Sequence, residues 1–310
     1  MKPLLDKKAV MLIGFGGPEA MDQVRPFLES VLKGVRIPQA RFEEVVHHYE
    51  IVGGVSPYNA ITYTQKEALG KELLVRGLEL PIFVGFRHST PSNADALSQM
   101  KALGIKQVVG FVLASLRSHA SFEKYIERIE EAKKEVGAEE ITFSYTAPFH
   151  EHPLFIEAQA DEVTQVIQKI NPSELDKTFF IFSAHSIPVG MAKESGYDKQ
   201  FEKTTECIVK KLNLSSWSVA YQSRSGNPAD PWLEPSVEKT IQEIDRDKFK
   251  NVVLVSAGFL CDNVEVIFDL DYECRRLCES LGLGYFRAKT VTDHPKFIHL
   301  VADLLTKSLS

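Results

Sequence analysis

The stretch that decides the fold is FFIFSAHSIPVG, residues 179–190. Four apolar residues run in succession, small residues follow, and His185 and Pro188 come directly behind them. A run of this kind is typical of a strand that is covered on both faces, as in a parallel sheet flanked by helices. The sequence therefore predicts a buried strand with an imidazole at its carboxyl end.

Similar apolar runs alternate with helical patterns along the whole chain. The other predicted strands cover residues 9–15, 81–86, 107–114, 141–146, 217–222, 251–257 and 284–290. The predicted helices include residues 121–136, 152–170, 236–244 and 294–309. Alternation of strands and helices is typical of parallel sheets with helical crossovers. The predicted fold class is therefore α/β, with doubly wound, Rossmann-like parallel sheets.

Two pairs of segments indicate that the chain holds two similar domains. FVGFRHSTP at 83–91 resembles FIFSAHSIP at 180–188, and KQVVGFVLAS at 106–115 resembles KNVVLVSAGF at 250–259. Chance similarity is the alternative, because buried strands draw on few residue types. Ligands of open α/β sheets bind beyond the carboxyl ends of the strands. We therefore expect the histidines of the first pair to lie at ligand-facing strand ends.

Composition and charge exclude several classes of function. The chain has 310 residues, a length typical of two domains, and 44% of them are hydrophobic. A formal net charge of −6 leaves no basic footprint for nucleic acid. No apolar stretch approaches the roughly 18 residues of a membrane span, and the N-terminus reads as a strand rather than a signal peptide. Four cysteines without framework spacing are typical of the reducing cytoplasm, where we expect the protein to be.

Acidic residues gather in GFLCDNVEVIFDLDYECRRLCE, residues 258–279, which follows a predicted strand and reads as a helix from about residue 263. Glu265, Asp269 and Glu273 recur every four residues and form a slanted ridge, which a local widening toward a π-helix would straighten. Like charges at this spacing repel each other. Acidic groups near a helix start also complement its dipole, so the run has a purely structural explanation as well.

An imidazole and a carboxylate ridge at neighbouring strand ends suit a borderline divalent cation such as ferrous iron. Two or three protein ligands with open positions describe a site that hands its metal on, whereas structural zinc sites are closed. His185 titrates near neutral pH, and the ridge could accept protons. An isolated strand-end histidine is more often a hydrogen-bonded core residue. The metal prediction therefore depends on the ridge lying beside the imidazole.

These motifs together resemble the ferrochelatase family, whose enzymes insert ferrous iron into a porphyrin on the way to haem. The shared segments are FSAHSIP, YQSRSGNPADPWLEPSV, SAGFLCDNVEVIFDLDYE, LIGFGGPEAMDQVRPFL, VGGVSPYNAITYTQKEAL and VGFRHSTP. They span nearly the whole chain in the family's order. The resemblance implies a class II chelatase-like fold of two similar domains around the porphyrin. We expect the first domain at 1–118 with a returning C-terminal helix at 291–310, and the second, with the metal site, at 119–290.

The resemblance also assigns roles to single residues. His185 and Glu265 match the pair that delivers the metal and removes protons, so both are expected to be metal-binding and catalytic. Asp269 and Glu273 match an acidic ridge that conducts iron or protons. The residues that match the porphyrin-binding surface are His88, Ser56, Pro57, Trp232, Leu233 and Arg25.

Several features leave alternatives open. Four arginines could meet the porphyrin propionates, because guanidinium binds carboxylate as a fork: Arg25, Arg36, Arg87 and Arg117. Asn263 stands where many relatives have a second histidine, and residues 112–121 lack the family's Pro-x-x-Ser run. Cys274 and Cys278 are four residues apart, as in half a metal site, although buried, unreactive thiols explain them equally well.

The resemblance implies an enzyme, a ferrochelatase acting on protoporphyrin IX or coproporphyrin III. Iron is then a substrate and no cofactor is permanently bound; a [2Fe–2S] cluster is not expected, because the sequence has no cysteine-rich C-terminal extension. Expected partners are the porphyrin and ferrous iron, with transient contact to other haem-pathway enzymes. The alternatives are a cobalt chelatase acting on sirohydrochlorin and a non-catalytic haem- or metal-binding protein of the same fold. The GFGGP opening lacks the glycine pattern of a nucleotide-binding loop.

Overall fold

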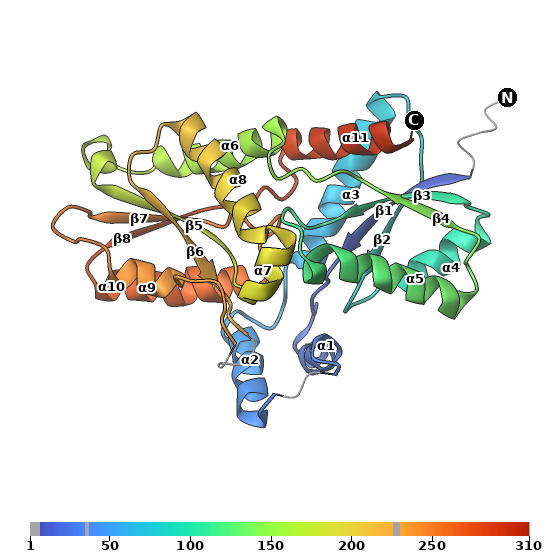
Figure 1. Cartoon of the computed structure of the whole chain (residues 1–310), viewed down its shortest axis with the longest axis horizontal. Helices are drawn as coiled ribbons and strands as arrows, with labels where there is room; N and C mark the ends of the chain where they lie inside the picture. The colour runs from blue at the N-terminus through green and yellow to red at the C-terminus, as the bar shows by residue number, and fades with distance from the viewer. Residues whose placement is uncertain (1–6, 35–36, 226–229, 310) are drawn as a thin grey trace. The chain divides into compact units, whose positions relative to one another are not determined.

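The structure is a computed structural model that describes residues 7–34, 37–225 and 230–309. It divides into two compact units, each built on one four-stranded parallel sheet with helices on both sides (Figure 1). The first unit comprises Met1–Ala114, Ala120–Pro148 and Asp293–Ser310, and the second comprises Ser115–His119 and Phe149–Thr292. The predicted α/β class with two doubly wound parallel sheets is confirmed.

The sheet of the first unit is buried on both faces. Its strands are β1 (Lys8–Gly14), β2 (Ile82–Phe86), β3 (Gln107–Val112) and β4 (Thr142–Tyr145), in the spatial order β2–β1–β3–β4. Every residue of β1 after Lys8 is buried, because helices pack on both sides of this central strand. That environment explains why the strand reads as a continuous apolar run.

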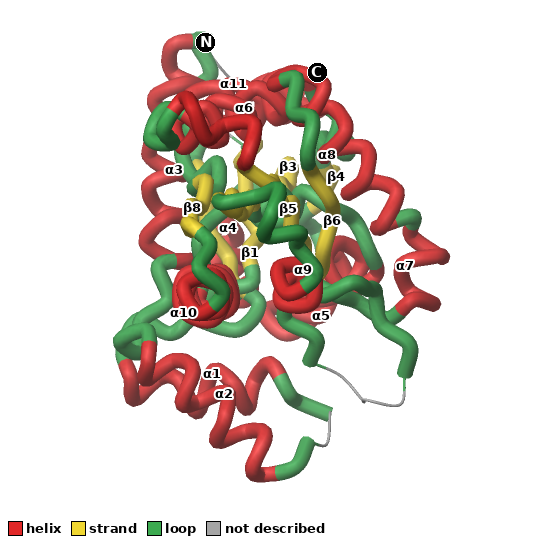
Figure 2. The backbone as a smooth tube through the Cα atoms, turned by 90° about the vertical axis from the view of Figure 1, so that its left-hand side faces the viewer, coloured by secondary structure: helices red, strands yellow, loops and turns green. Residues whose placement is uncertain are grey.

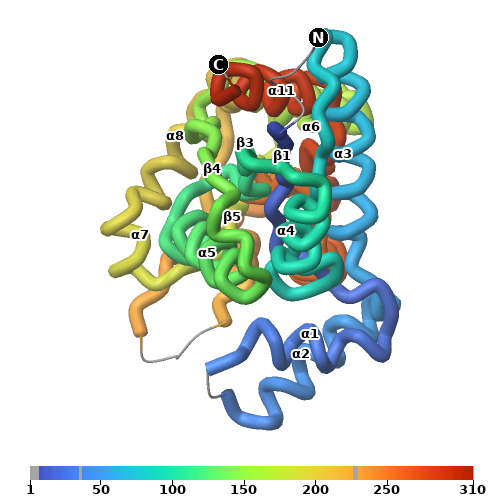
Figure 3. The backbone as a smooth tube through the Cα atoms, turned by 90° about the vertical axis from the view of Figure 1, so that its right-hand side faces the viewer, coloured from blue at the N-terminus to red at the C-terminus, as the bar shows by residue number. Residues whose placement is uncertain are grey.

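Two layers of helices cover this sheet, and a further pair lies apart from it. The helices of the unit are α1 (Val24–Val31), α2 (Gln39–Ile51), α3 (Tyr58–Val75), α4 (Asn93–Ala102), α5 (Lys124–Val136) and α11 (Pro295–Leu309). α4 and α5 bury Leu97 and Ile129 against one face of the sheet. α3 and α11 cover the other face, so the end of the chain lies beside its first third (Figure 3). α1 and α2 pair with each other below the sheet (Figure 2).

The second unit repeats this plan. Its strands are β5 (Thr178–His185), β6 (Trp217–Gln222), β7 (Asn251–Val255) and β8 (Gly284–Ala288), in the spatial order β6–β5–β7–β8. Its helices are α6 (Pro153–Ile167), α7 (Val189–Ser195), α8 (Tyr197–Leu212), α9 (Val237–Gln242), the π-helix η4 (Val266–Cys274) and α10 (Arg275–Ser280). α9, η4 and α10 share one apolar cluster with β5 and β7, and α6 packs against α8 elsewhere in the unit.

The two units are similar, but not in the way that the histidine segments indicated. Across each sheet, the strand that comes second in the sequence of its unit lies at one edge, followed by the first, the third and the fourth. β5 therefore corresponds to β1, and β6 corresponds to β2. The segment FVGFRHSTP contains β2, an edge strand, whereas FIFSAHSIP contains the central β5. His88 and His185 therefore follow strands that are not equivalent. The second segment pair does match equivalent strands, β3 and β7.

The boundary between the units also differs from the predicted one. The sequence predicts a boundary at 118/119, whereas the main change of unit comes after Pro148, and only Ser115–His119 of the earlier stretch belongs to the second unit. The reason is that β4 pairs in parallel with β3 and α5 packs on α4. A strand and helix that the prediction gave to the second domain thus complete the first sheet. The C-terminal helix belongs to the first unit.

Candidate active site

His185 is the last residue of β5, and its backbone is held on two sides. The N–H of Ser186 donates to the carbonyl of Gln222 on β6 at 2.7 Å. The buried Tyr197 hydroxyl donates to the carbonyl of His185 at 3.1 Å. Gly258 lies so close to Ala184 that an added Cβ would sit 2.5 Å from the Cβ of Ala184. The strand end is therefore rigid, while the imidazole remains 28% exposed.

The two ring nitrogens of His185 have different surroundings. Nδ1 lies 2.5 Å from the carbonyl oxygen of Ser186. A carbonyl only accepts hydrogen bonds, so Nδ1 carries a proton and donates. Nε2 lies 3.8 Å from Oε1 of Glu265. In the neutral ring, the lone pair on Nε2 therefore points to the side of the Glu265 carboxylate, where it can bind a metal ion or a proton.

The two side chains influence each other's proton affinity. Burial lowers the pKa of His185, but the Glu265 carboxylate, the Ser186 carbonyl and Asp269 outweigh it and raise this pKa above its ordinary value. The Glu265 side chain is 48% exposed, so its partial desolvation, which acts to raise its pKa, is overcome by the nearby imidazolium, and the Glu265 pKa is lowered. The pair therefore favours a protonated imidazole beside an ionised carboxylate.

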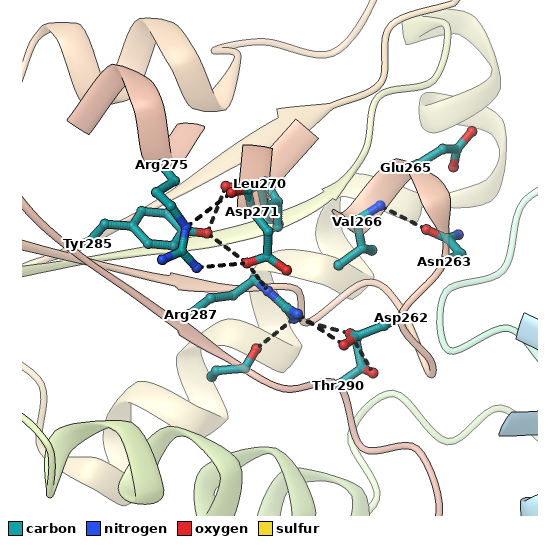
Figure 4. A network of polar contacts seen from close by, with 12 residues as sticks. Asp262, Asn263, Glu265, Val266, Leu270, Asp271, Arg275, Tyr285, Arg287 and Thr290 are labelled. Carbon is teal, nitrogen blue, oxygen red and sulfur yellow. Dashed lines mark hydrogen bonds and ion pairs between the residues drawn. The ribbon is translucent and has the colours of Figure 1, made fainter. Parts of the chain in front are cut away.

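Glu265 stands at the start of the π-helix η4 (Figure 4). The Oδ1 atom of Asn263 accepts from the N–H of Val266 at 2.8 Å and so satisfies one of the free amides at the helix start. Val266, Leu270 and Cys274 are buried against the sheet. The helix is wound as a π-helix from Val266 to Cys274, where the sequence predicted only a helix from about residue 263. Asn263, which stands where many relatives have a second histidine, caps its start.

Asp269 lies one step along the ridge and has lost much of its acidity. It accepts hydrogen bonds from the Ser223 hydroxyl and from Nε2 of Gln222, the latter at 3.4 Å. Burial raises the pKa of Asp269 to about 7, the Ser223 hydrogen bond opposes this, and Glu265, Glu238 and Glu273 add to the rise. Glu273, the third member of the predicted ridge, is exposed. Of the ridge, Asp269 is thus the group that exchanges protons near neutral pH.

Two further acidic residues of the segment, Asp262 and Asp271, share one arginine, and Asp271 also lies 3.9 Å from Arg275. Arg287 on β8 pairs with Asp262 at 3.0 Å and with Asp271 at 2.7 Å (Figure 4). Arg287, Ser223 and Gln222 were not predicted as site residues from the sequence. The only signal for Arg287 was a charged residue directly after the aromatic pair of a predicted strand, GYFRAKT at 284–290.

Trp232 and Leu233 belong to the same unit as His185. The N–H of Leu233 donates to the carbonyl of Ile187 at 3.0 Å, and Trp232 forms an isolated bridge with Pro188. Both predicted wall residues are therefore tied to the loop that follows the catalytic candidate. The indole Nε1 of Trp232 is buried and has no hydrogen-bond partner among the described residues. Residues 226–229 of the same motif lie outside the described residues.

The remaining porphyrin-binding candidates belong to the first unit. Burial and the charge of Arg87 lower the pKa of His88 to about 4, and its Nδ1 lies 3.0 Å from the Ser30 hydroxyl. Ser56 is buried; it packs against Gly17, and Pro57 follows it at the start of α3. Both terminal nitrogens of Arg25 already bind Glu43, at 2.9 and 2.6 Å. Arg36 lies outside the described residues.

The described residues hold no group of three or more His, Cys, Asp or Glu side chains arranged to bind one metal ion. Cys274 and Cys278 are buried free thiols, and burial raises the pKa of Cys278 to about 12 and that of Cys274 further. A buried thiol with a raised pKa is a poor metal ligand, because the thiolate is the form that binds. His185 and Glu265 thus place two possible donor atoms, Nε2 and Oε1, 3.8 Å apart.

Comparison with known proteins decides the family. A family model described as Ferrochelatase matches residues 7–309. The chain belongs to the ferrochelatase family. A ferrochelatase of Rhodopirellula baltica is 38% identical over 310 residues, which are 100% of this chain and 88% of the relative. A coproporphyrin III ferrochelatase of Mycolicibacterium smegmatis is 35% identical and is aligned over 97% of this chain and 89% of its own.

Ferrochelatases are enzymes of haem biosynthesis that insert iron into a porphyrin, and the chain is one of these enzymes. Among solved structures, the cobalt complex of the sirohydrochlorin chelatase SirB from Bacillus subtilis subspecies spizizenii has a TM-score of 0.58 at 10% identity, with 97% of this chain and 95% of that one covered. SirB from Bacillus subtilis with Fe³⁺ has a TM-score of 0.60 at 11% identity and the same coverage. These likenesses concern the fold alone, and they confirm the predicted class II chelatase-like fold. Within the described part of the chain, no helix is both long and apolar enough to cross a membrane.

Proposed function

We propose that this chain inserts ferrous iron into coproporphyrin III, with His185 and Glu265 as the residues that hold the metal and accept the displaced protons. The observation that carries this proposal is the arrangement of Nε2 of His185 opposite Glu265 at 3.8 Å, with Nδ1 engaged by the Ser186 carbonyl. Several relatives of 32–35% identity act on coproporphyrin III by name, which favours this substrate over protoporphyrin IX.

The donor pair suits an ion that is held and then released. Two donor atoms 3.8 Å apart can both lie about 2.1 Å from one ion placed between them, the usual distance for imidazole and carboxylate ligands of zinc, because their separation is less than twice that distance. Imidazole and carboxylate are suitable ligands for ferrous iron. Two protein ligands leave most positions of the ion open, so porphyrin nitrogens can replace water and then the protein.

The same two groups balance the protons. Binding of Fe²⁺ to the pair displaces the proton that Nε2 of His185 otherwise carries. The porphyrin loses two N–H protons as the iron enters its centre, and the departing iron leaves Nε2 and the Glu265 carboxylate each able to accept one. Asp269, with a pKa of about 7, then passes protons on toward solvent. The acid–base work is thus confined to residues on β5 and η4.

Other roles follow from the family resemblance and stay predictions. They include porphyrin contacts by His88, Ser56, Pro57, Trp232, Leu233 and Arg25, and iron or proton conduction by Glu273. We further propose that iron acts only as substrate, without a resident cluster. The buried, weakly acidic thiols of Cys274 and Cys278 support this. Four free cysteines support a cytoplasmic location.

The test is an anaerobic metal-insertion assay with purified protein. Fe²⁺ is supplied with coproporphyrin III or protoporphyrin IX, and Co²⁺ with sirohydrochlorin, and the absorbance of the metallated product is followed. We expect turnover with Fe²⁺ and coproporphyrin III, and a loss of about 100-fold or more in kcat for His185→Ala and Glu265→Gln. His299→Ala is the matched control, because it removes an imidazole that also lies beside carboxylates, Glu72 and Asp303.

Each outcome decides between the alternatives. Higher kcat/KM for protoporphyrin IX would overturn the substrate assignment, and turnover only with Co²⁺ and sirohydrochlorin would favour the cobalt chelatase. Stoichiometric porphyrin or metal binding without turnover would favour a carrier. Full activity in His185→Ala would overturn the role of the pair.

A further inference from the structure

Arg287 is a largely buried arginine, and among the described residues its side chain donates to Asp262 and Asp271 around the active-site helix and to Ala288 on its own strand. Its side chain is 11% exposed. Its two terminal nitrogens bind the two carboxylate oxygens of Asp262 at 3.1 and 3.0 Å, and Nε donates to Asp271 at 2.7 Å. One terminal nitrogen also donates to the Ala288 carbonyl at 3.3 Å. This is the fork geometry in which guanidinium binds carboxylate most specifically.

Asp262 and Asp271 lie on either side of Glu265 in the sequence. Asp262 lies three positions before Glu265, in the turn that leads into the helix, and Asp271 lies six positions after it, within the π-helix. One rigid side chain on β8 therefore connects the segment before Glu265 to the segment after it (Figure 4). Rotation or unwinding of the helix between these points would break one of the two contacts.

Neighbouring groups reinforce both contacts. The Thr290 hydroxyl donates to Oδ1 of Asp262 at 3.0 Å. The Tyr285 hydroxyl donates to the Leu270 carbonyl at 2.7 Å and lies 3.2 Å from Oδ1 of Asp271. A helix wound with i→i+5 hydrogen bonds is rare and needs outside support to keep its winding. Thr290, in the loop after β8, supports the turn before the helix, and Tyr285, on β8, supports the helix itself at Leu270 and Asp271.

The charges agree with a permanent contact. Burial lowers the pKa of Arg287, but its hydrogen bonds with Asp271 and Asp262 raise the pKa well above the ordinary value, so the guanidinium stays charged. If it were removed, Asp262 would lose its guanidinium partner and Asp271 would keep only the more distant Arg275, at 3.9 Å, beside a helix that already carries Glu265 and Asp269. A lysine at this position would keep the positive charge but would not hold the helix in the same way, because its ammonium group cannot bind three carboxylate oxygens in one fixed plane.

We propose that Arg287 is a positioning residue that sets the register of the π-helix and thereby holds the Glu265 carboxylate opposite Nε2 of His185. It touches neither metal nor porphyrin; it acts through the backbone of residues 262–271. The inference rests on the proposed function of the His185–Glu265 pair. If that function is correct, loss of Arg287 weakens capture of the divalent metal and leaves porphyrin binding intact.

The test compares Arg287→Lys with Arg76→Lys. Arg76 is the matched control, because it also bridges two carboxylates, Glu72 and Asp303, but does so between α3 and α11 in the first unit. We expect Arg287→Lys to raise KM for Fe²⁺ by about 10-fold or more, as for other residues that orient metal ligands, with KM for the porphyrin unchanged. Arg76→Lys should change neither constant. Far-UV circular dichroism and thermal unfolding show whether each variant is folded.

A second readout does not depend on turnover. Co²⁺ is titrated into each protein without porphyrin and its visible absorption is followed, with His185→Ala as the reference for loss of the site. We expect a weaker Co²⁺ affinity for Arg287→Lys and an unchanged one for Arg76→Lys. If Arg287→Lys does not fold, Asp271→Ala is used instead; it keeps the fork to Asp262 and should weaken Co²⁺ binding in the same direction.

The outcomes separate the two claims. An active wild-type protein with unchanged Fe²⁺ KM and Co²⁺ affinity in the folded Arg287 and Asp271 variants would overturn the positioning role. Equal increases of the metal and porphyrin constants, or the same effect in Arg76→Lys, would overturn it too, because they indicate general destabilisation. A wild-type protein without any iron insertion would overturn the proposed function, whereas the Co²⁺ titrations would still decide the role of Arg287.

Discussion

Asp269 and Glu265 are neighbours on one helix but differ in proton affinity. Glu265 faces an imidazole that favours its ionised form, and its pKa is lowered. Asp269 faces the neutral donors Ser223 and Gln222, and burial raises its pKa to about 7. The folded protein therefore binds the Asp269 proton more tightly than the unfolded chain, in which the carboxyl has its ordinary value of 3.8. Near neutral pH, folding and the ionisation of Asp269 oppose each other.

This opposition predicts a pH-dependent effect of Asp269→Asn. Between about pH 4 and 7, only the unfolded chain gains from ionising Asp269, so the wild-type free energy of unfolding should fall through this window and then level off. The Asn side chain keeps the oxygen that accepts from Ser223 and Gln222 but cannot ionise. Each unit of pKa shift corresponds to about 1.4 kcal/mol, so we expect Asp269→Asn to be more stable than wild type by at least about 1 kcal/mol at pH 8. Urea unfolding at several pH values measures this.

The advantage of Asp269→Asn should disappear toward pH 4, and Asp247→Asn, at an exposed position, should show no such trend. A constant difference in the free energy of unfolding between Asp269→Asn and wild type from pH 4 to 8 would contradict the raised pKa of Asp269.

The residue scale also shows what the sequence could predict. His185 and Glu265 could be paired, because each follows a buried strand and parallel strands end at one edge. Arg287 could not, because its partners are set by the folding of the turn at Asp262.

At the scale of elements, the π-helix η4 has two regular faces. Three carboxylates recur every four positions, at 265, 269 and 273, and so do three buried residues, at 266, 270 and 274, while Phe268 is buried as well. The sequence predicted a helix here and showed that a π-widening would align the carboxylates, but it did not specify that winding. The likeness of the two His-Ser-x-Pro segments suggested equivalent strands, which is wrong. Buried strands carry similar apolar residues whether they lie at the edge or in the centre of a sheet.

The buried face of this helix and of α10 predicts inert thiols. Burial disfavours the thiolate and raises the pKa of Cys274, Cys278 and Cys261, and all three are buried, whereas Cys207 is partly exposed. We expect a thiol reagent such as DTNB to modify about one thiol of the native protein and all four after unfolding. The replacement Cys207→Ser should remove the native reaction. A fast reaction that survives this replacement would show that η4 or α10 opens, or that these thiols are activated.

At the scale of the whole chain, each unit has a core of its own, yet the first is assembled from three separate stretches. The alternation of strands and helices predicted two parallel sheets, but it could not tell which sheet the strand at 142–145 would join. That choice depends on the pairing of β4 with β3, a contact that a pattern of apolar residues does not specify. Family resemblance, rather than periodicity, indicated that the last helix returns to the first unit.

This arrangement predicts that a substitution near the C-terminus weakens the N-terminal sheet. Phe297 on α11 is fully buried and packs edge-to-face against Phe111 of β3, with the ring centroids 6.3 Å apart. Phe297→Ala should therefore cost about 3–5 kcal/mol in the first unit. In hydrogen–deuterium exchange, amides of β1 and β3 should exchange faster, while those of β5 and β7 stay protected. The mirror control is Phe182→Ala in β5, which should accelerate β5 and β7 instead. Equal acceleration of both sheets by either variant would mean that the two cores unfold as one, and the division into independent units would be wrong.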